Sequence, residues 1–520
     1  MSASARPTQA EINASILDVD HLKSGIGQRT ARGGAIIMAA QVIRMAAQLV
    51  TTMFLARLLV PDDFGVVAIG YTILTFVMMF ADLSLSSVTV QIKKLTQDTA
   101  SALFYLNVGL ALTALIVIAL CAPFLGWVFR DDRIPMVAIG LIASAPVNAL
   151  GGQHQALLLR NMKWVNLQIL QMGSMLIGSI VAVLCAWLTD LGYWSLVVQA
   201  MVSAMSGVIL AWTMCRWRPS RVQSWSNARS ALFTSLNLSG NTILAFAHRQ
   251  VDNMLIAWKW GPTELGYYSR AYNLLMLPRN LVVGSLSSAF IPALSRLQDD
   301  ASKWRRAYLD SLAVVTIFGG AFTALLFGSS DTVIDIVLGP GWERAELIFS
   351  YLVIAMLVGI PMQTVVWIYV SLGRSRRMLL WGVIGTTAYV TSFIIGLPGG
   401  GPGVAMAYAT AQVLAFIPCL WMATRKTSVT LVDVMKICLP LMAATLAVGF
   451  ALRLANAHLG MFGSVAATAA GGVVYLGLVS LLVWFWPPMR SVRDRLYPMI
   501  RSGAGQALAY MRGSRSPKAG

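Results

Sequence analysis

Two predicted helices contain polar stripes that could bind an anion. The first stripe lies in the apolar segment 33–55, where spacings of three, four and four residues place its members on one helical face: Gln41, Arg44, Gln48 and Thr52. The second lies in the segment 233–258 and contains Asn241, Ala245, His248, Arg249 and Asp252. Because an arginine facing lipid at mid-membrane costs roughly 2.5–3.5 kcal/mol, we expect Arg44 to face water, a partner helix or an anionic substrate.

Two further arginines lie in the next predicted helix, 267–294. Arg270 is near its outer end, and Arg279 directly follows Pro278 about midway along it. A proline leaves a backbone carbonyl without its helical partner, so Arg279 either binds that carbonyl or faces the substrate. We predict that both arginines belong to the same cationic cleft as the two stripes.

Three ionisable residues are candidates for ion coupling: His248, Asp252 and Asp82. Asp252 follows Arg249 by three residues, so the two either form a structural ion pair or take part in transport. We predict that His248 and Asp252 act as a proton-coupled pair. Asp82 lies at the end of the second predicted span, where a proton site and a helix-end role both stay open.

The elements that would position these residues are duplicated. Residues 53–71 and 254–272 align without a gap at an offset of 201 residues, and each copy joins two apolar segments through a turn with a proline, an acidic residue and a glycine. The same offset superimposes the first polar stripe on the second. We therefore predict two like lobes around a shared polar cleft, lined by the first and seventh spans, as in alternating-access transporters.

Composition indicates a polytopic membrane protein. Of the 520 residues, 57% are hydrophobic and only 12% are charged, and the mean hydropathy is +0.70. Most of the apolar stretches reach the ~20 residues that a membrane-spanning helix needs. The predicted fold class is all-α, with about 14 transmembrane helices. Two parallel six-helix lobes related by pseudo-twofold symmetry are followed by a C-terminal helix pair.

The repeat and the charge pattern divide the chain into six predicted parts. They are a cytoplasmic N-terminal tail (1–32), an N-terminal six-helix lobe (33–215), a cytoplasmic connector (216–228), a C-terminal six-helix lobe (229–424), an additional helix pair (437–486) and a basic cytoplasmic tail (487–520). The loops between spans are short, and the longest predicted outer loop is 328–344. We therefore expect no extracytoplasmic domain.

The formal charge is +18, and the distribution of the basic residues along the chain indicates the membrane topology. Few basic residues fall in the predicted outer segments, and these are Arg57, Arg130, Arg133, Lys259, Arg344 and Arg453. By the positive-inside rule, both termini then face the cytoplasm. The remaining charge suits contact with anionic membrane lipids, so nucleic acid is not a predicted partner.

Motifs for enzymes and metal sites are weak. The five cysteines and four histidines are dispersed without a CxxC pair, so we predict no metal site, disulfide or cofactor. No GxSxG, Walker A or HExxH sequence occurs, which argues against an ATP-driven pump. Acidic pairs such as Asp62-Asp63 and Asp131-Asp132 lie at predicted helix ends, where solvated turns and caps are the default interpretation.

Several short segments follow one another in a characteristic order along nearly the whole chain. They are RxxxGxxxxxxxQ at 29–41, Ala56-Arg57 to Gly65, ALLLRNMK at 156–163, Tyr267 to Tyr272, FIPALSR at 290–296 and LGPGW at 338–342. Together with the duplicated lobes and the extra helix pair, these segments resemble the polysaccharide-transporter branch of the multidrug/oligosaccharidyl-lipid/polysaccharide (MOP) flippase superfamily. The resemblance is greatest to its Wzx-type members.

The resemblance implies a flippase or exporter rather than an enzyme. Such a protein moves an undecaprenyl-diphosphate-linked oligosaccharide repeat unit across the inner membrane, by ion-coupled alternating access, for exopolysaccharide, capsule or O-antigen synthesis. Its implied partners are this lipid-linked oligosaccharide, membrane lipids, and a polysaccharide polymerase with chain-length proteins. The free-energy cost of desolvating the diphosphate would be offset by charge-assisted hydrogen bonds, which would come from Arg44, Arg249, Arg270 and Arg279.

Three other functions stay open at this stage. A lipid II flippase would also use a cationic cleft. A MATE-type antiporter of the same superfamily would need a carboxylate-lined cleft, whereas the first stripe has an arginine and no acid. A membrane glycan polymerase or ligase would be expected to present a sizeable periplasmic loop with catalytic residues, and the predicted loops are too short for one.

Overall fold

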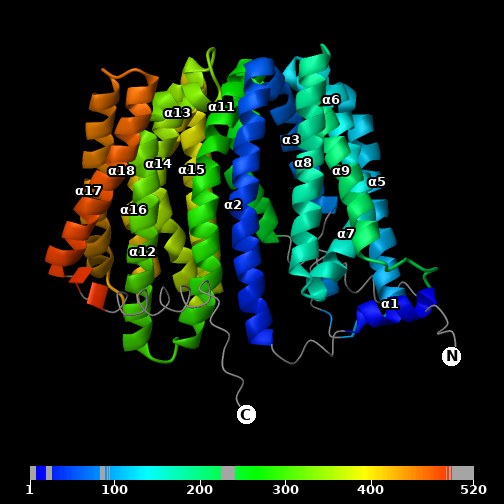
Figure 1. Ribbon diagram of the computed structural model, residues 1–520, viewed down its shortest axis with the longest axis horizontal. Coiled ribbons are helices and arrows are strands. Elements are labelled where there is room, and N and C mark those ends of the chain that lie inside the picture. The colour runs from blue at the N-terminus through cyan, green and yellow to red at the C-terminus, as the bar shows by residue number, and fades with distance from the viewer. Residues whose placement is uncertain are drawn as a thin grey trace. The chain divides into compact units, whose positions relative to one another are not determined.

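The computed structural model describes residues 8–18, 26–81, 88–90, 92, 94–223, 240–487, 489–490 and 493–494. Every regular element within these residues is a helix, which confirms the predicted all-α fold class (Figure 1). In this part of the chain, eleven segments are long and apolar enough to cross a membrane. One of them, Ser375–Thr424, has 50 residues and contains two long helices. The count of about 14 and the symmetry of the lobes stay predictions.

The chain divides into two compact units. The first contains Met1–Asn273, Ile334–Ile348 and Thr386–Ala407, and the second contains Leu274–Val333, Phe349–Gly385 and Tyr408–Gly520. These units combine segments from both halves of the sequence repeat. The lobes, connector, tails and helix pair proposed from the repeat therefore stay a prediction.

The first unit contains most of the N-terminal helices. In chain order these are α1 (Gln9–Leu17), α2 (Ile26–Leu58), α3 (Pro61–Ala81), α5 (Gln97–Phe129), α6 (Arg133–Ile142), α7 (Ser144–Arg160), α8 (Trp164–Leu188) and α9 (Trp194–Met214). The N-terminal part of α11 (Gly240–Arg296) belongs to the same unit. Gly261 interrupts α11 with φ 80° and ψ −176°, so two helices meet there.

Small residues allow the helices of the first unit to pack closely. A Cβ atom added to Gly178 of α8 would lie 1.9 Å from the Ser203 hydroxyl oxygen of α9. α2 packs against α8, and α3 packs against α6. Helix α6 ends at Ile142 and α7 begins at Ser144, and together they form one candidate membrane span, Arg133–Arg160.

Helix α1 lies across one end of the first unit, beside the end of α5 (Figure 1). It begins with a capping box, in which Thr8 and Glu11 each bond the other's backbone N–H. Its last residue, Leu17, is buried in an apolar cluster with Leu158 and Trp217. Helix α1, which lies inside the predicted N-terminal tail, is therefore packed onto one end of the first unit.

The second unit is built around α12 (Ala301–Gly328). Its other elements, some of which extend into the first unit, are α13 (Ser330–Val337), α14 (Glu343–Ser371), α15 (Ser375–Gly396), the 3₁₀ turn η2 (Leu397–Gly399), α16 (Gly400–Thr424), α17 (Leu431–Asn456) and α18 (Met461–Phe485). The C-terminal pair α17 and α18 packs against α12. Gly320 of α12 makes this contact close, because an added Cβ atom would lie 2.3 Å from the Tyr475 hydroxyl oxygen of α18.

Candidate functional site

Arg44 lies on α2 and is half-buried. Its Nη2 donates a 2.8 Å hydrogen bond to Oε1 of Gln168 on α8, and its Nε is buried with no partner among the described residues. In this part of the chain no carboxylate forms an ion pair with Arg44. The guanidinium is therefore oriented by a neutral amide, and its charge stays available to an anion.

Two of the other three members of the first stripe differ in exposure, and the third, Thr52, is buried. Gln41 is half-buried and Gln48 is exposed, both on α2. The stripe therefore runs from the interface with α8 onto a face that the first unit does not cover. The structure tests neither residue as a substrate ligand, so their role stays a prediction.

The second stripe lies on α11, and Asp252 is its most buried described member. The Asp252 carboxylate accepts a 2.8 Å hydrogen bond from the Tyr268 hydroxyl and a 2.9 Å bond from the Asn253 backbone N–H. Arg249 is exposed. The carboxylate is thus held by a phenol that sequence reasoning missed, because Tyr268 lies beyond the Gly261 break and no short spacing connects it to Asp252.

Three predicted site residues cannot be placed in full. Asn241 and His248 lie in α11, but their side chains are outside the described part of the structure. Asp82 lies between the described segments 26–81 and 88–90, so its position is not described either. The proposed coupling of His248 with Asp252 therefore stays a prediction.

The two arginines of the predicted helix 267–294 belong to different units. Arg270 is in the first unit, where its guanidinium carbon lies 4.6 Å from the centre of the Phe64 ring, a cation–π contact. Its Nε is buried and has no partner among the described residues. Arg279 is in the second unit, and its Nη1 lies 3.3 Å from the weakly accepting sulfur of Met276. Both guanidinium groups thus have donors left for an anion.

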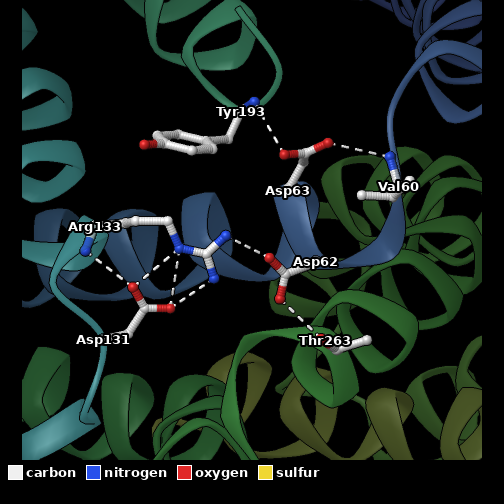
Figure 2. Close-up of polar contacts among 7 residues, drawn as sticks. All are labelled: Val60, Asp62, Asp63, Asp131, Arg133, Tyr193 and Thr263. Atoms are coloured by element: carbon white, nitrogen blue, oxygen red, sulfur yellow. Dashed lines mark hydrogen bonds and ion pairs between the residues drawn. The ribbon is translucent and has the colours of Figure 1, made fainter.

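The two copies of the repeated turn meet within the first unit. Thr263 donates a 2.8 Å hydrogen bond from its hydroxyl to Oδ1 of Asp62, the residue 201 positions earlier that it matches in the repeat (Figure 2). A Cβ atom added to Gly65 would lie 1.7 Å from the Pro262 carbonyl oxygen, and one added to Gly266 would lie 1.8 Å from the Pro61 carbonyl oxygen. The contact is therefore reciprocal, with each turn touching the equivalent residues of the other.

Each turn also contacts the start of a helix that comes later in its own repeat. Asp63 accepts hydrogen bonds from the backbone N–H groups of Tyr193, just before α9, and of Val60 (Figure 2). Glu264 accepts a 2.7 Å bond from the backbone N–H of Gly401, at the start of α16, and pairs with Arg344 at 2.6 Å. Acidic groups are favourable there, because helix N-termini present free N–H donors.

Arg133 connects Asp62 to the start of α6. It forms ion pairs with Asp62 and with Asp131, the latter at 2.7 Å (Figure 2). The hydrogen bond from Arg133 lowers the pKa of Asp131 below its ordinary value. Arg133 thus joins one member of each acidic pair, Asp62 and Asp131, which the sequence suggests to be ordinary caps.

Comparison with known proteins identifies the family. A profile of the family described as "Polysaccharide biosynthesis protein" matches residues 54–347, which is more than half of the chain. The chain belongs to this family. Its predicted resemblance to the polysaccharide-transporter branch of the MOP superfamily is thereby confirmed.

Relatives of this family member align over most of its length. It is 24% identical over 460 residues to the succinoglycan biosynthesis transport protein ExoT of Rhizobium meliloti (strain 1021). This alignment covers 87% of this chain and 92% of that protein. It is 21% identical over 439 residues to the lipopolysaccharide biosynthesis protein WzxC of Escherichia coli (strain K12), covering 82% and 89%. The teichuronic acid biosynthesis protein TuaB of Bacillus subtilis (strain 168) is 20% identical over 426 residues, covering 80% and 87%.

Two solved structures share the fold of this family member. The lipid II flippase MurJ, in an inward closed conformation, matches with a TM-score of 0.66 and 16% identity over 86% of this chain and 98% of that chain. An inward-facing MATE multidrug transporter of the MOP superfamily matches with a TM-score of 0.56 and 14% identity, covering 78% and 99%. The chain is therefore a multi-pass membrane protein with a MurJ- and MATE-like helical fold.

Proposed function

We propose that this protein is a flippase that moves an undecaprenyl-diphosphate-linked oligosaccharide from the cytoplasmic to the periplasmic leaflet of the inner membrane. The product would be used for exopolysaccharide, capsule or O-antigen synthesis. The observation that carries the proposal is the alignment of most of this chain with most of a named exopolysaccharide transport protein, ExoT. A transport role therefore applies to the whole bundle rather than to one part of it.

A polysaccharide precursor is favoured over lipid II as the substrate. The three relatives that align over most of the chain are named for the biosynthesis of succinoglycan, lipopolysaccharide and teichuronic acid. Those names describe different glycans, so the feature most easily shared by the substrates is the lipid diphosphate and not one particular sugar. The same relatives favour a transporter over a membrane glycan polymerase or ligase.

The arginines support an anionic substrate group. Arg44 and Arg270 each keep a buried Nε without a partner among the described residues, and Arg270 is stabilised by an aromatic ring rather than by a carboxylate. Such cations are costly in a membrane unless an anion or water meets them. A diphosphate would supply that anion through charge-assisted hydrogen bonds, with Arg249 as a further donor in the first unit. The role predicted for Arg279, which lies in the second unit, stays a separate proposal.

Sidedness and coupling complete the proposal. The distribution of basic residues supports cytoplasmic termini, which puts α1 inside and the junction of the two turns outside. We propose Asp252, hydrogen-bonded to Tyr268, as one proton site, with His248 and Asp82 as the other candidates. A polysaccharide polymerase and chain-length proteins are proposed partners, since they would consume the flipped unit.

The experiment that tests this function uses a strain lacking the protein. The strain is expected to accumulate lipid-linked repeat units in the cytoplasmic leaflet, and the wild-type protein should restore polymer export. Arg44→Ala and Arg249→Ala should fail to restore it while reaching the membrane at wild-type levels. Arg130→Ala, which removes an exposed arginine outside the stripes, is the matched control and should restore export. Full export with both stripe variants would contradict the cationic cleft.

A further inference from the structure

We propose that the second unit has a binding site for the phosphate of an anionic phospholipid, where the turn between α14 and α15 meets the turn between α16 and α17. The two turns and the first residues of α15 contain five basic residues, here called the basic cluster: Arg374, Arg376, Arg377, Arg425 and Lys426. None of them belongs to the polar stripes of α2 and α11. The site is therefore independent of the proposed flipping function.

Two arginines of the basic cluster converge on one backbone oxygen. Nη1 of Arg374 and Nη1 of Arg377 donate hydrogen bonds of 3.1 and 2.8 Å to the Arg425 carbonyl oxygen, and Nη2 of Arg374 donates to the Lys426 carbonyl oxygen. The two half-buried guanidinium groups therefore lie side by side. A guanidinium has five N–H donors, so each of the two keeps donors for a further acceptor.

The charge of the basic cluster is not neutralised by the described part of the chain, in which no carboxylate forms an ion pair with any of its five members. In the same unit, by contrast, Arg305 pairs with Asp433 at 2.8 Å. Burial and the neighbouring charge of Arg377 lower the pKa of Arg374 below its ordinary value. Like charges held together in this way favour an anion that binds both of them.

The backbone after α16 holds this arrangement in place. Lys426 adopts a left-handed conformation with φ 61°, which is uncommon for a residue other than glycine. The carbonyl oxygens of Arg425 and Lys426 both face Arg374 as a result. The side chains of Arg425 and Lys426 take no part in these backbone bonds and are exposed, so their charges are available to a ligand.

Exposed apolar side chains next to the basic cluster identify the ligand as a lipid. The guanidinium carbon of Arg425 lies 5.2 Å from the centre of the Trp421 ring, in the last turn of α16, and this tryptophan is 53% exposed. Met378 and Leu379 in the first turns of α15 and Ile417 of α16 are exposed as well. Tryptophan is enriched at the headgroup level of membranes. A phospholipid would use both parts of this surface, whereas a soluble anion would use only the arginines.

The first test measures how lipids stabilise the purified protein in detergent. Phosphatidylglycerol should raise the Tm by several degrees, and phosphatidylcholine at the same concentration should not, because only a lipid that binds the folded protein stabilises it. Arg425→Gln combined with Lys426→Asn removes two charges but keeps both carbonyl acceptors, and asparagine tolerates a positive φ. This double variant should lose most of the increase in Tm.

The matched control is Lys303→Gln combined with Arg306→Gln. It also removes two charges from the second unit, but both residues lie on α12, outside the basic cluster. The control should keep the wild-type increase in Tm with phosphatidylglycerol. A wild-type increase in the variant of Arg425 and Lys426, or an equal loss in the two double variants, would overturn the site.

The second test alters no residue. Phosphatidylglycerol with a photoactivatable group on one acyl chain, reconstituted with the protein in liposomes, should cross-link to peptides that contain Met378 or Trp421. Unlabelled phosphatidylglycerol should compete, and phosphatidylcholine should not. Cross-links spread evenly over the exposed helices would overturn the proposal. Competition by undecaprenyl diphosphate but not by phosphatidylglycerol would also overturn it, because the site would then belong to the transported lipid.

Discussion

Asp62 shows how one residue can serve two contacts. It accepts a hydrogen bond from Thr263 of the other turn and forms an ion pair with Arg133 at the start of α6. Arg133 in turn bonds Asp131, so a single guanidinium holds two carboxylates close to the repeat junction. We expect these ion pairs to stabilise this end of the first unit, with the modest energy typical of partly exposed ion pairs.

Removal of Arg133 should therefore weaken the fold in a pH-dependent way. Arg133→Gln should lower the free energy of unfolding by about 0.5–1 kcal/mol at pH 7, because the side chain is 38% exposed and solvent screens the pair. The folded-state pKa of Asp131 is lowered, so its contribution is complete above the unfolded pKa of about 4 and is lost as pH falls through the folded value. The measurement is thermal unfolding in detergent. If the difference in the free energy of unfolding between the wild type and the variant does not become smaller below pH 4, this account is contradicted.

Two variants of Gln168 can distinguish the effect of the charge of Arg44 from the effect of its orientation. Gln168→Ala removes the amide that orients Arg44 but keeps the cation, so flipping should fall about tenfold, as for loss of one hydrogen bond to a charged group, and not vanish. Gln168→Glu should instead neutralise Arg44 and reduce flipping as severely as Arg44→Ala. The check is export in the complemented strain. Equal losses in Gln168→Ala and Gln168→Glu would show that the charge of Arg44 is not what matters.

Residue types on a helical face could be predicted, but their partners could not. The spacing in 41–48 identified Arg44 as unpaired within its helix, which agrees with a structure in which its partner comes from α8. The distance along the chain from Arg44 to Gln168 is 124 residues, and no sequence pattern reports such a pairing. Likewise, Tyr268 reaches Asp252 only because α11 breaks at Gly261.

At the scale of elements, α1 is hydrogen-bonded to the connector that follows α9, of which residues 216–223 are described. Asn13 donates a 2.9 Å hydrogen bond to the Arg218 carbonyl oxygen and accepts a 3.0 Å bond from the Arg218 N–H. Trp217 is fully buried beside these bonds, and its Nε1 donates to Gln97 of α5. A connector held so firmly should move with the first unit during transport.

Loss of Asn13 should release this connector. Asn13→Ala leaves the Arg218 backbone N–H without its partner, a cost of about 1–3 kcal/mol, whereas the Arg218 carbonyl keeps its bond from Gln97. Trypsin should therefore cut after Arg221 faster than in the wild type. The assay is limited proteolysis of inside-out vesicles. Ser15→Ala is the matched control, because Ser15 is exposed and its hydroxyl bonds the Ile12 carbonyl oxygen of its own helix. Equal cleavage of both variants would contradict anchoring by α1.

Apolar length predicted the long helices well, and irregular elements less well. Internal prolines such as Pro123 and Pro361 left α5 and α14 continuous, as expected for helices in a membrane. The short break between α6 and α7 lies three residues before Pro146, whose missing N–H leaves the Ile142 carbonyl without its helical donor.

For the whole molecule, the sequence repeat has a physical counterpart in the first unit. Thr263 bonds the residue that it matches in the first copy, and the two glycines of the turns make reciprocal contacts. A repeat can predict that equivalent turns exist, but not that they touch, because contact depends on the conformation captured. In this structure the contact brings equivalent residues of the two copies together.

The central claim is that the protein transfers a lipid-linked oligosaccharide between leaflets without changing it. The most direct measurement reconstitutes the purified protein in liposomes with undecaprenyl-diphosphate oligosaccharide, and follows access of an impermeant glycan-oxidising reagent to the inner-leaflet pool. We predict that the inner pool becomes accessible in the presence of the protein, with glycan length unchanged and with no gain for Arg44→Ala. Access equal to that in protein-free liposomes, or a lengthened glycan, would contradict the account.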